Sequence, residues 1–177
     1  HPNDPYGSLK YALSQATSGD TIHIYPGVYQ EIFPMTVPAG VTVKGHSMRS
    51  VNITPTVATN SNDAFLLNGG ATIEDLTISG FYTGYAFKFA PGFVVSGNNR
   101  SPYMRNLSVI TMGSVTSAAD PRGFAQGDAG KGAYIDGAVA GATSLEATML
   151  FHSATFITPG VDAITVTNGA RVEWLNS

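Results

Sequence analysis

Four ionisable residues stand at equivalent places in four similar segments of the chain, where they could carry acid–base chemistry. They are Glu74, Arg105, His152 and Glu173. Two carboxylates that cleave a glycosidic bond must lie about 5–9.5 Å apart. If the segments stack as neighbouring strands, Glu74 and Glu173 lie about 14 Å apart, which is too far for them to cooperate. We therefore interpret the set as a cross-strand ladder in which Glu74 pairs with Arg105.

Other patterns that could carry chemistry are incomplete. Neither His23 nor His46 has a second histidine or a carboxylate at metal-ligand spacing. The string GDAGKG (residues 127–132) lacks the first glycine and the final Ser or Thr of a phosphate-binding loop. There is no Gly-x-Ser-x-Gly motif and no cysteine. The sequence therefore predicts no catalytic residue, no metal ligand and no cofactor.

An aromatic segment, a long loop and the last strand supply candidates for contact with a glycan or another subunit. In residues 80–93, Phe87 and Phe89 alternate as core residues do, which leaves Tyr82 and Tyr85 open as surface candidates. Residues 111–132 have no apolar period and exceed ordinary loop length, which is typical of a functional loop, a chain contact or a mobile insertion. The contact candidates are Tyr82, Tyr85, Arg122, Phe124, Gln126, Lys131 and Trp174.

The composition favours one β-rich domain over residues 1–177. Hydrophobic residues make up 43% and charged residues 12%, against about 25% charged residues in typical domains, and there are 20 glycines. The net charge of −3 gives no basic surface for nucleic acid, and no apolar run is long enough for membrane insertion. Because the sequence begins at His1 without Met and stops within a strand-like segment, we expect it to be part of a longer chain.

Hydrophobic periodicity predicts one helix followed by short strands. Leu9, Ala12, Leu13 and Ala16 have helical spacing, and Ser8 is a suitable N-cap, so we predict a helix over residues 8–17. After Gly19 the period changes to two, which is typical of strands whose alternate residues face a core.

Internal similarity indicates how these strands are arranged. The segment DAFLLNGGATIEDL (residues 63–76) resembles DAITVTNGARVEWL (residues 162–175). Residues 85–92 and 132–139 echo its first half, and YMRNLSV and LFHSATF echo its second half. Repeats with insertions between them predict a right-handed, single-stranded parallel β-helix, with the helix over residues 8–17 covering its N-terminal end. The predicted core positions are Ile22, Ile24, Val41, Val43, Ile73, Leu76, Met104, Leu107, Phe151 and Val172.

A column of small polar residues marks a predicted bend in each repeat. Asp75, Asn106 and Ser153 occupy it in three repeats, and Trp174 takes the aligned position in the fourth. A large aromatic ring cannot continue such a stack, so we expect Trp174 to project outward. The unpaired edge of the last strand and this outward ring favour contact with more chain or with another subunit.

Residues 6–55 resemble the N-terminal coil of the pectin-lyase-like parallel β-helix superfamily. The string GDTIHIYPGVYQE is similar to the matching stretch of pectin methylesterases. The strings QAVA and DFIFG, which carry methylesterase chemistry, are absent, and the aspartates form no calcium cluster like that of pectate lyases. The resemblance therefore implies a fold and no activity.

A second resemblance covers almost the whole chain. The strings GVTVKGHSMRSVNITPT, SVTSAADPRGFAQGDAGKGAYIDG and MLFHSATFITPG look like those of a virion structural protein of tailed phages that infect marine cyanobacteria. This resemblance implies a non-enzymatic tail or fibre module, extracellular on the virion, homotrimeric with other virion subunits as partners, and in contact with host surface glycan. The alternative is a tailspike-like lyase or hydrolase that acts on host polysaccharide.

Overall fold

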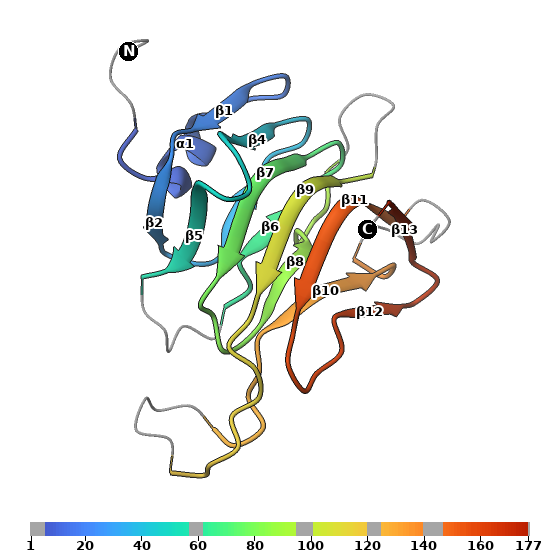
Figure 1. Ribbon diagram of the computed structural model, residues 1–177. Helices are drawn as coiled ribbons and strands as arrows, with labels where there is room; N and C mark the ends of the chain where they lie inside the picture. Colours follow the sequence, from blue (N-terminus) through green and yellow to red (C-terminus); the bar gives the residue numbers. More distant parts are fainter. Residues whose placement is uncertain (1–5, 57–61, 95–100, 120–124, 140–146, 177) are drawn as a thin grey trace.

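The computed structural model describes residues 6–56, 62–94, 101–119, 125–139 and 147–176. These residues form one short helix and two parallel β-sheets, so the protein belongs to the all-β class (Figure 1). We call the larger sheet A and the smaller sheet B. Sheet A contains β1 (Thr21–Ile24), β2 (Gly27–Glu31), β4 (Thr42–Gly45), β5 (Val51–Pro55), β7 (Thr72–Ser79), β9 (Tyr103–Ile110), β11 (Thr148–Ile157) and β13 (Arg171–Leu175). Sheet B contains β3 (Met35–Val37), β6 (Phe65–Leu67), β8 (Tyr85–Phe89), β10 (Lys131–Asp136) and β12 (Ile164–Thr167).

The chain alternates between the two sheets, and each new strand pairs with the preceding strand of the same sheet position. Sheet A follows the order β1-β4-β7-β9-β11-β13, with β2 and β5 beside it, and sheet B follows the order β12-β10-β8-β6-β3. All the paired strands are parallel; for example, Ile73 of β7 lies beside Met104 of β9. The predicted succession of stacked parallel strands is therefore confirmed.

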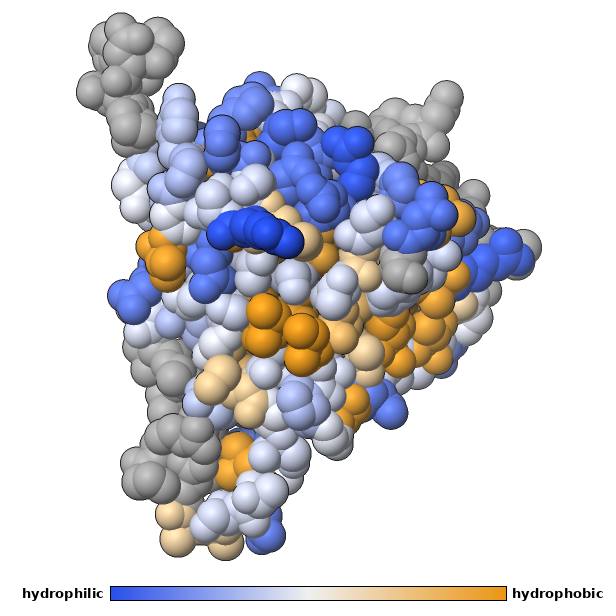
Figure 2. All heavy atoms as spheres, in the orientation of Figure 1, coloured by the Kyte–Doolittle hydropathy of each residue, from blue (hydrophilic) through white to orange (hydrophobic). Residues whose placement is uncertain are grey.

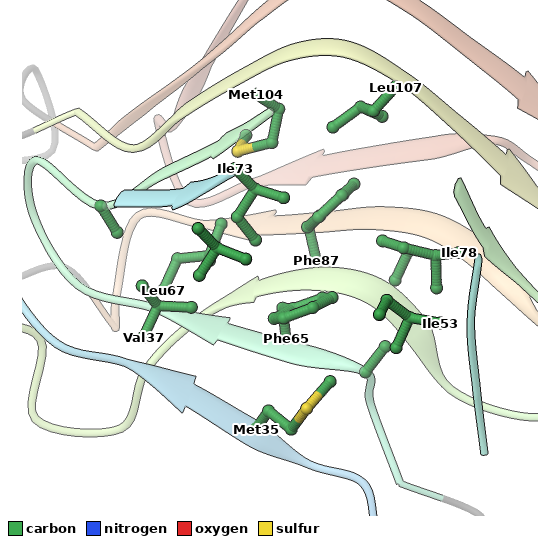
Figure 3. Packing of buried hydrophobic residues seen from close by; sticks show 14 of the residues in the cluster. Met35, Val37, Ile53, Phe65, Leu67, Ile73, Ile78, Phe87, Met104 and Leu107 are labelled. Carbon is green, nitrogen blue, oxygen red and sulfur yellow. The ribbon is translucent and has the colours of Figure 1, made fainter. Parts of the chain in front are cut away.

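The core lies between the two sheets, where alternate residues of each strand face inward (Figure 3). Phe65 and Phe87 of sheet B stack with their ring centroids 6.2 Å apart. Ile73 and Met104 of sheet A are fully buried against them in the same cluster. Among the predicted core positions, Ile22 and Val172 are half-buried and the others are buried.

The helix α1 (Leu9–Gln15) is shorter than the predicted span of residues 8–17, because Ala16 already has an extended backbone. Its Ser8 N-cap is confirmed, since the side chain accepts a hydrogen bond from the N–H of Tyr11. No sequence pattern indicates the anchor of the helix, which is the buried carboxylate of Glu31. That carboxylate accepts hydrogen bonds from the Ser8 hydroxyl (2.9 Å) and from the N–H of Leu9 (2.6 Å). The helix packs chiefly against β3 and β2.

A left-handed backbone position recurs at the bend of sheet A. Asp75, Asn106 and Ser153 have φ angles of 60°, 48° and 52°, and the Asn106 amide donates a hydrogen bond to the Asp75 carboxylate (2.6 Å). Asn and Asp tolerate this conformation better than most residues do. The fourth member is Asn176, with φ 48°, so the prediction that Trp174 holds this position is wrong.

Trp174 lies in the apolar column, two residues from its predicted place. It pairs with Phe151, and the two rings stack with centroids 5.2 Å apart. The ring is 38% exposed because β13 is the last strand of sheet A, but it packs against Phe151 and Phe156 rather than projecting outward. By the same shift, Val172 lies beside Met149, so its predicted place beside Phe151 is also wrong.

The predicted loop over residues 111–132 ends two residues earlier, because Lys131 and Gly132 begin β10. The described part of the connection is not structureless. Ser114 and Ala129 form an antiparallel bridge, and the N–H of Val115 donates to the carbonyl of Asp128 (2.8 Å). Val115 is buried, so this segment has an anchored base.

We predict that Gly45→Ala destabilises the fold by about 1–3 kcal/mol, because neighbouring strands approach too closely there for a side chain. A Cβ atom on Gly45 would lie 2.1 Å from the carbonyl oxygen of Asp75. Gly7→Ala is the control, since no heavy atom lies within 4 Å of a Cβ atom at that position. Urea unfolding of both variants measures the effect, and equal midpoints would contradict the register of β4 and β7.

Candidate functional site

The outward face of sheet A carries a row of ion-paired side chains. The register places Lys44 of β4 beside Glu74 of β7, and Glu74 beside Arg105 of β9. The Glu74 side chain is only 9% exposed, and its carboxylate binds the Lys44 ammonium (2.6 Å) and the Arg105 Nε (3.0 Å). The predicted pair of Glu74 and Arg105 is thus confirmed, with Lys44 as a further partner. Figure 2 shows hydrophilic residues gathered in the upper part of this face.

Two opposing effects set the pKa of Glu74. Burial alone would raise it, but the hydrogen bonds from Lys44 and Arg105 and their positive charges outweigh burial. The pKa of this carboxyl therefore lies below its usual value, and Glu74 is ionised at neutral pH. A carboxylate held between two cations is a poor proton donor, which is typical of a structural ladder rather than of a general acid.

His152 continues the row on β11, but Glu173 does not. The Tyr103 hydroxyl lies 3.0 Å from Nδ1 of His152, and Asn176 lies 3.5 Å from Nε2. Leu175 of β13 is the residue beside His152, whereas Glu173 pairs with Leu150. The predicted alignment of Glu173 with Glu74, Arg105 and His152 is therefore wrong.

The outward face of sheet B carries a different group, which we call the tyrosine–lysine cluster: Tyr85 and Lys88 of β8 with Lys131 and Tyr134 of β10. The register pairs Lys131 with Tyr85 and Tyr134 with Lys88. The two tyrosine rings have centroids 5.3 Å apart at an interplanar angle of 45°. The Lys131 ammonium lies 5.3 Å from the Tyr85 centroid, and the Lys88 ammonium lies 5.5 Å from the Tyr134 centroid.

Asp63 fixes one side of this cluster. Its carboxylate accepts a hydrogen bond from the N–H of Tyr85 (2.9 Å) and lies 3.1 Å from the Lys88 ammonium. Within the described residues, no carboxylate lies within ion-pair distance of Lys131. The cluster thus combines Lys88, which Asp63 holds in place, with Lys131, which has no carboxylate partner among the described residues, and the two half-buried tyrosine rings. Aromatic faces and side-chain donors of this kind bind rings that carry hydroxyl groups, and the free ammonium attracts anions.

The structure brings together two of the predicted contact residues, Tyr85 and Lys131. Tyr82 lies half-buried before β8, and Trp174 lies on the last strand of sheet A. Gln126 is exposed in the long connection, and its amide donates to the carbonyl of Thr116 (3.1 Å). The remaining predicted contact residues, Arg122 and Phe124, lie outside the described residues.

Sequence reasoning missed Lys88 and Tyr134. The sequence repeats align Tyr85 with Gly132, whereas the strand register pairs Tyr85 with Lys131. A shift of one residue reverses the face on which a side chain lies. The sequence alignment therefore places Tyr134 beside the buried Phe87 instead of beside Lys88. Outward polar residues in both repeats would have revealed the correct alignment.

No protein-family profile, curated protein or solved structure matches the chain. In the part of the chain that the structure describes, no group of three His, Asp or Glu side chains is arranged to hold a metal ion. No helix among the same residues is long and apolar enough to span a membrane.

We predict that Glu74→Gln lowers the free energy of unfolding at neutral pH by about 1–3 kcal/mol, because both charge-assisted contacts weaken. Since the folded pKa is depressed, the ionised pairs stabilise the fold fully above the unfolded Glu pKa of about 4.3. This contribution is lost as pH falls through the lower folded pKa. The difference between wild type and Glu74→Gln should therefore shrink on acidification, as measured by urea unfolding at a series of pH values.

The matched control for that experiment is Glu173→Gln. Glu173 is exposed and has no ion-pair partner among the described residues. This variant should unfold like wild type at neutral pH. A pH-independent loss in Glu74→Gln would contradict the electrostatic role of the row.

Proposed function

We propose that the chain is a right-handed, single-stranded parallel β-helix of the pectin-lyase type, and that it serves as a non-enzymatic structural module of a phage virion. The observation that carries the proposal is the regular alternation of parallel strands between two sheets, each strand paired with that of the previous passage. Such stacking buries a continuous core along one axis, which suits a rigid, elongated component. The helix α1 at the N-terminal end is the expected cap.

The place in the virion rests on sequence likeness. The long strings that resemble those of virion proteins of cyanobacterial phages support a tail- or fibre-associated module, extracellular on the particle. Other virion subunits are its partners in this proposal, and a homotrimer with parallel axes is its assembly.

An exposed apolar strip supports contact between subunits. Ile110 of β9 lies beside Ile157 of β11, and the two side chains are 37% and 47% exposed. Met112, two residues after Ile110, is 51% exposed. Figure 2 shows hydrophobic residues gathered in the lower part of this face. Contiguous exposed apolar side chains commonly mark a protein–protein contact.

The tyrosine–lysine cluster is the proposed contact with host surface glycan. Its rings present flat faces, Lys131 supplies a cation, and Asp63 holds Lys88 in place. Contacts within the cluster already restrict the two rings and Lys88, which lowers the entropic cost of binding.

A second candidate is a lyase or hydrolase that acts on the same class of polysaccharide. The contact between Tyr103 and His152 favours it, since a hydroxyl and an imidazole in hydrogen-bond distance can exchange protons. Arg105 lies beside His152 in the register and could neutralise a uronate carboxylate. Lys44 and Arg105 both bind the carboxylate of Glu74, which favours the structural role instead.

We predict that Tyr85→Ala and Tyr134→Ala each weaken binding to capsular polysaccharide extracted from marine cyanobacteria by about tenfold, equal to about 1.4 kcal/mol. Tyr11→Ala is the control, because Tyr11 is an exposed tyrosine on α1 and is not part of the tyrosine–lysine cluster of β8 and β10. Isothermal titration calorimetry measures the affinities. Equal affinity of all three variants would contradict the glycan site.

Incubating the protein with the same polysaccharide and analysing the products separates the two candidate functions. The structural proposal expects neither new reducing ends nor unsaturated sugars from the polysaccharide. Turnover that disappears in His152→Ala, while binding persists, would replace the structural proposal with the lyase.

For assembly, we predict a trimer in sedimentation velocity at micromolar concentration, and we predict that Ile157→Glu dissociates it, because a charge cannot be buried unpaired in the apolar strip. Val28→Glu is the control, since Val28 is 69% exposed and lies on β2. A wild-type monomer would contradict the trimer.

A further inference from the structure

A groove of about 680 Å³ lies between α1 and the first strand of sheet A. Every residue from Asp20 to Tyr25 lines it, so the groove follows the whole of β1. Ala12 of α1 and Tyr29 of β2 also line it. Volumes of this order hold small ligands and short peptide segments.

Among the described residues, β1 is an edge strand that pairs with β4 and with no other strand. The carbonyls of Asp20 and Ile24 accept hydrogen bonds from β4 and from the turn after it, both at 2.9 Å. In a strand, the N–H and C=O of one residue point to the same side, and this side alternates along the chain. The backbone groups of Thr21, His23 and Tyr25 therefore point away from β4.

Part of this free edge already has a partner. The Tyr29 hydroxyl donates a hydrogen bond to the carbonyl of Tyr25 (2.8 Å). For Thr21 and His23, the described residues provide no partner on the side away from β4. An exposed row of this kind is a template for one further strand.

The cap formed by α1 does not cover this edge, because the helix packs chiefly against β3 and β2. The groove consequently has an apolar floor where a further strand would place its inward side chains. Leu9, Ala12 and Ile24 are buried there, and Ile22 is half-buried. At the start of β1, Asp20 adds a negative charge, since hydrogen bonds from the Thr17 N–H and hydroxyl lower its pKa.

We propose that this groove binds an extended peptide segment of another protein chain, which adds to β1 as a parallel strand. The partner segment has small apolar residues at alternate positions, which face Ile22 and Ile24, and a basic residue near Asp20. The row of backbone groups at Thr21 and His23 selects a polypeptide, because an extended backbone repeats its donors and acceptors at the same interval. The proposal is independent of the glycan site on sheet B.

The test uses the full chain and a synthetic peptide of about seven residues, acetylated and amidated, with one N-terminal lysine followed by alternating threonine and valine. In the parallel register with valines inward, the valine N–H groups point to β1 and the threonine N–H groups point away. We expect N-methylation of the valines to weaken binding by at least about tenfold, and N-methylation of the threonines to leave it unchanged. Equal effects of both modifications would overturn strand addition.

The matched protein variants are His23→Pro and His23→Ala. Proline removes the N–H that faces the groove and is tolerated on edge strands, whereas alanine keeps that N–H. We expect His23→Pro to lose at least about tenfold in peptide affinity, and His23→Ala to bind like wild type. Equal affinities of the two variants would contradict the proposal.

Amide hydrogen exchange of the wild-type protein gives a readout that does not depend on a variant's fold. The peptide should slow exchange at Thr21 and His23 by at least about tenfold while leaving the amide of Ile22, already bonded to β4, unchanged. No added protection at Thr21 and His23 would overturn the proposal. If neutral oligosaccharides shift the NMR resonances of Tyr25 and Tyr29 and the peptide does not, the groove binds sugars and the proposal is overturned.

Discussion

The hydrogen-bond ladder between successive parallel strands is the constraint on which every other feature of this protein depends. It joins residues that are distant in sequence, as the side-chain hydrogen bond beside it also does: Asn106 and Asp75 are 31 residues apart and occupy the same bend position on β9 and β7. The ladder fixes the spacing of the strands, and the spacing then decides which side chains fit. Gly45 must lack a side chain because Asp75 approaches it, and the bend residues must tolerate a left-handed backbone.

The same ladder makes each face of the two sheets a series of stacked residues. Inward, Ile73, Met104 and Phe151 follow one another on β7, β9 and β11. Outward, the neighbours of those residues also line up, so a charge on one strand always faces the equivalent position on the next. Lys44, Glu74 and Arg105 alternate in sign along this line, which turns a potential repulsion into attraction.

Periodicity predicted the strands and most of the core, because alternation within one strand is a local property of the sequence. The partner of each strand was predictable only where the connections kept the repeats in phase. Between β11 and β13 the sequence alignment is shifted by two residues, which places Trp174 at the bend beside Ser153 instead of in the apolar column beside Phe151. Between β8 and β10 it slipped by one residue, which hid Tyr134 from the predicted surface. The buried Glu31 at the N-terminus of α1 is a contact across 22 residues that no periodic pattern contains.

The two outward faces differ in how far their charges are already bound within the protein. On sheet A, the oxygens of Glu74 are bound by Lys44 and Arg105, so binding a ligand there would require breaking contacts to a buried carboxylate. On sheet B, the Lys131 ammonium lies over the half-buried ring of Tyr85 and has no carboxylate partner among the described residues, so it keeps most of its capacity to bind an anion or a hydroxyl. Forming a contact on sheet B therefore costs less than forming one on sheet A. The row that stabilises the stack and the cluster suited to recognition can then evolve separately, because they lie on different sheets and share no side chain.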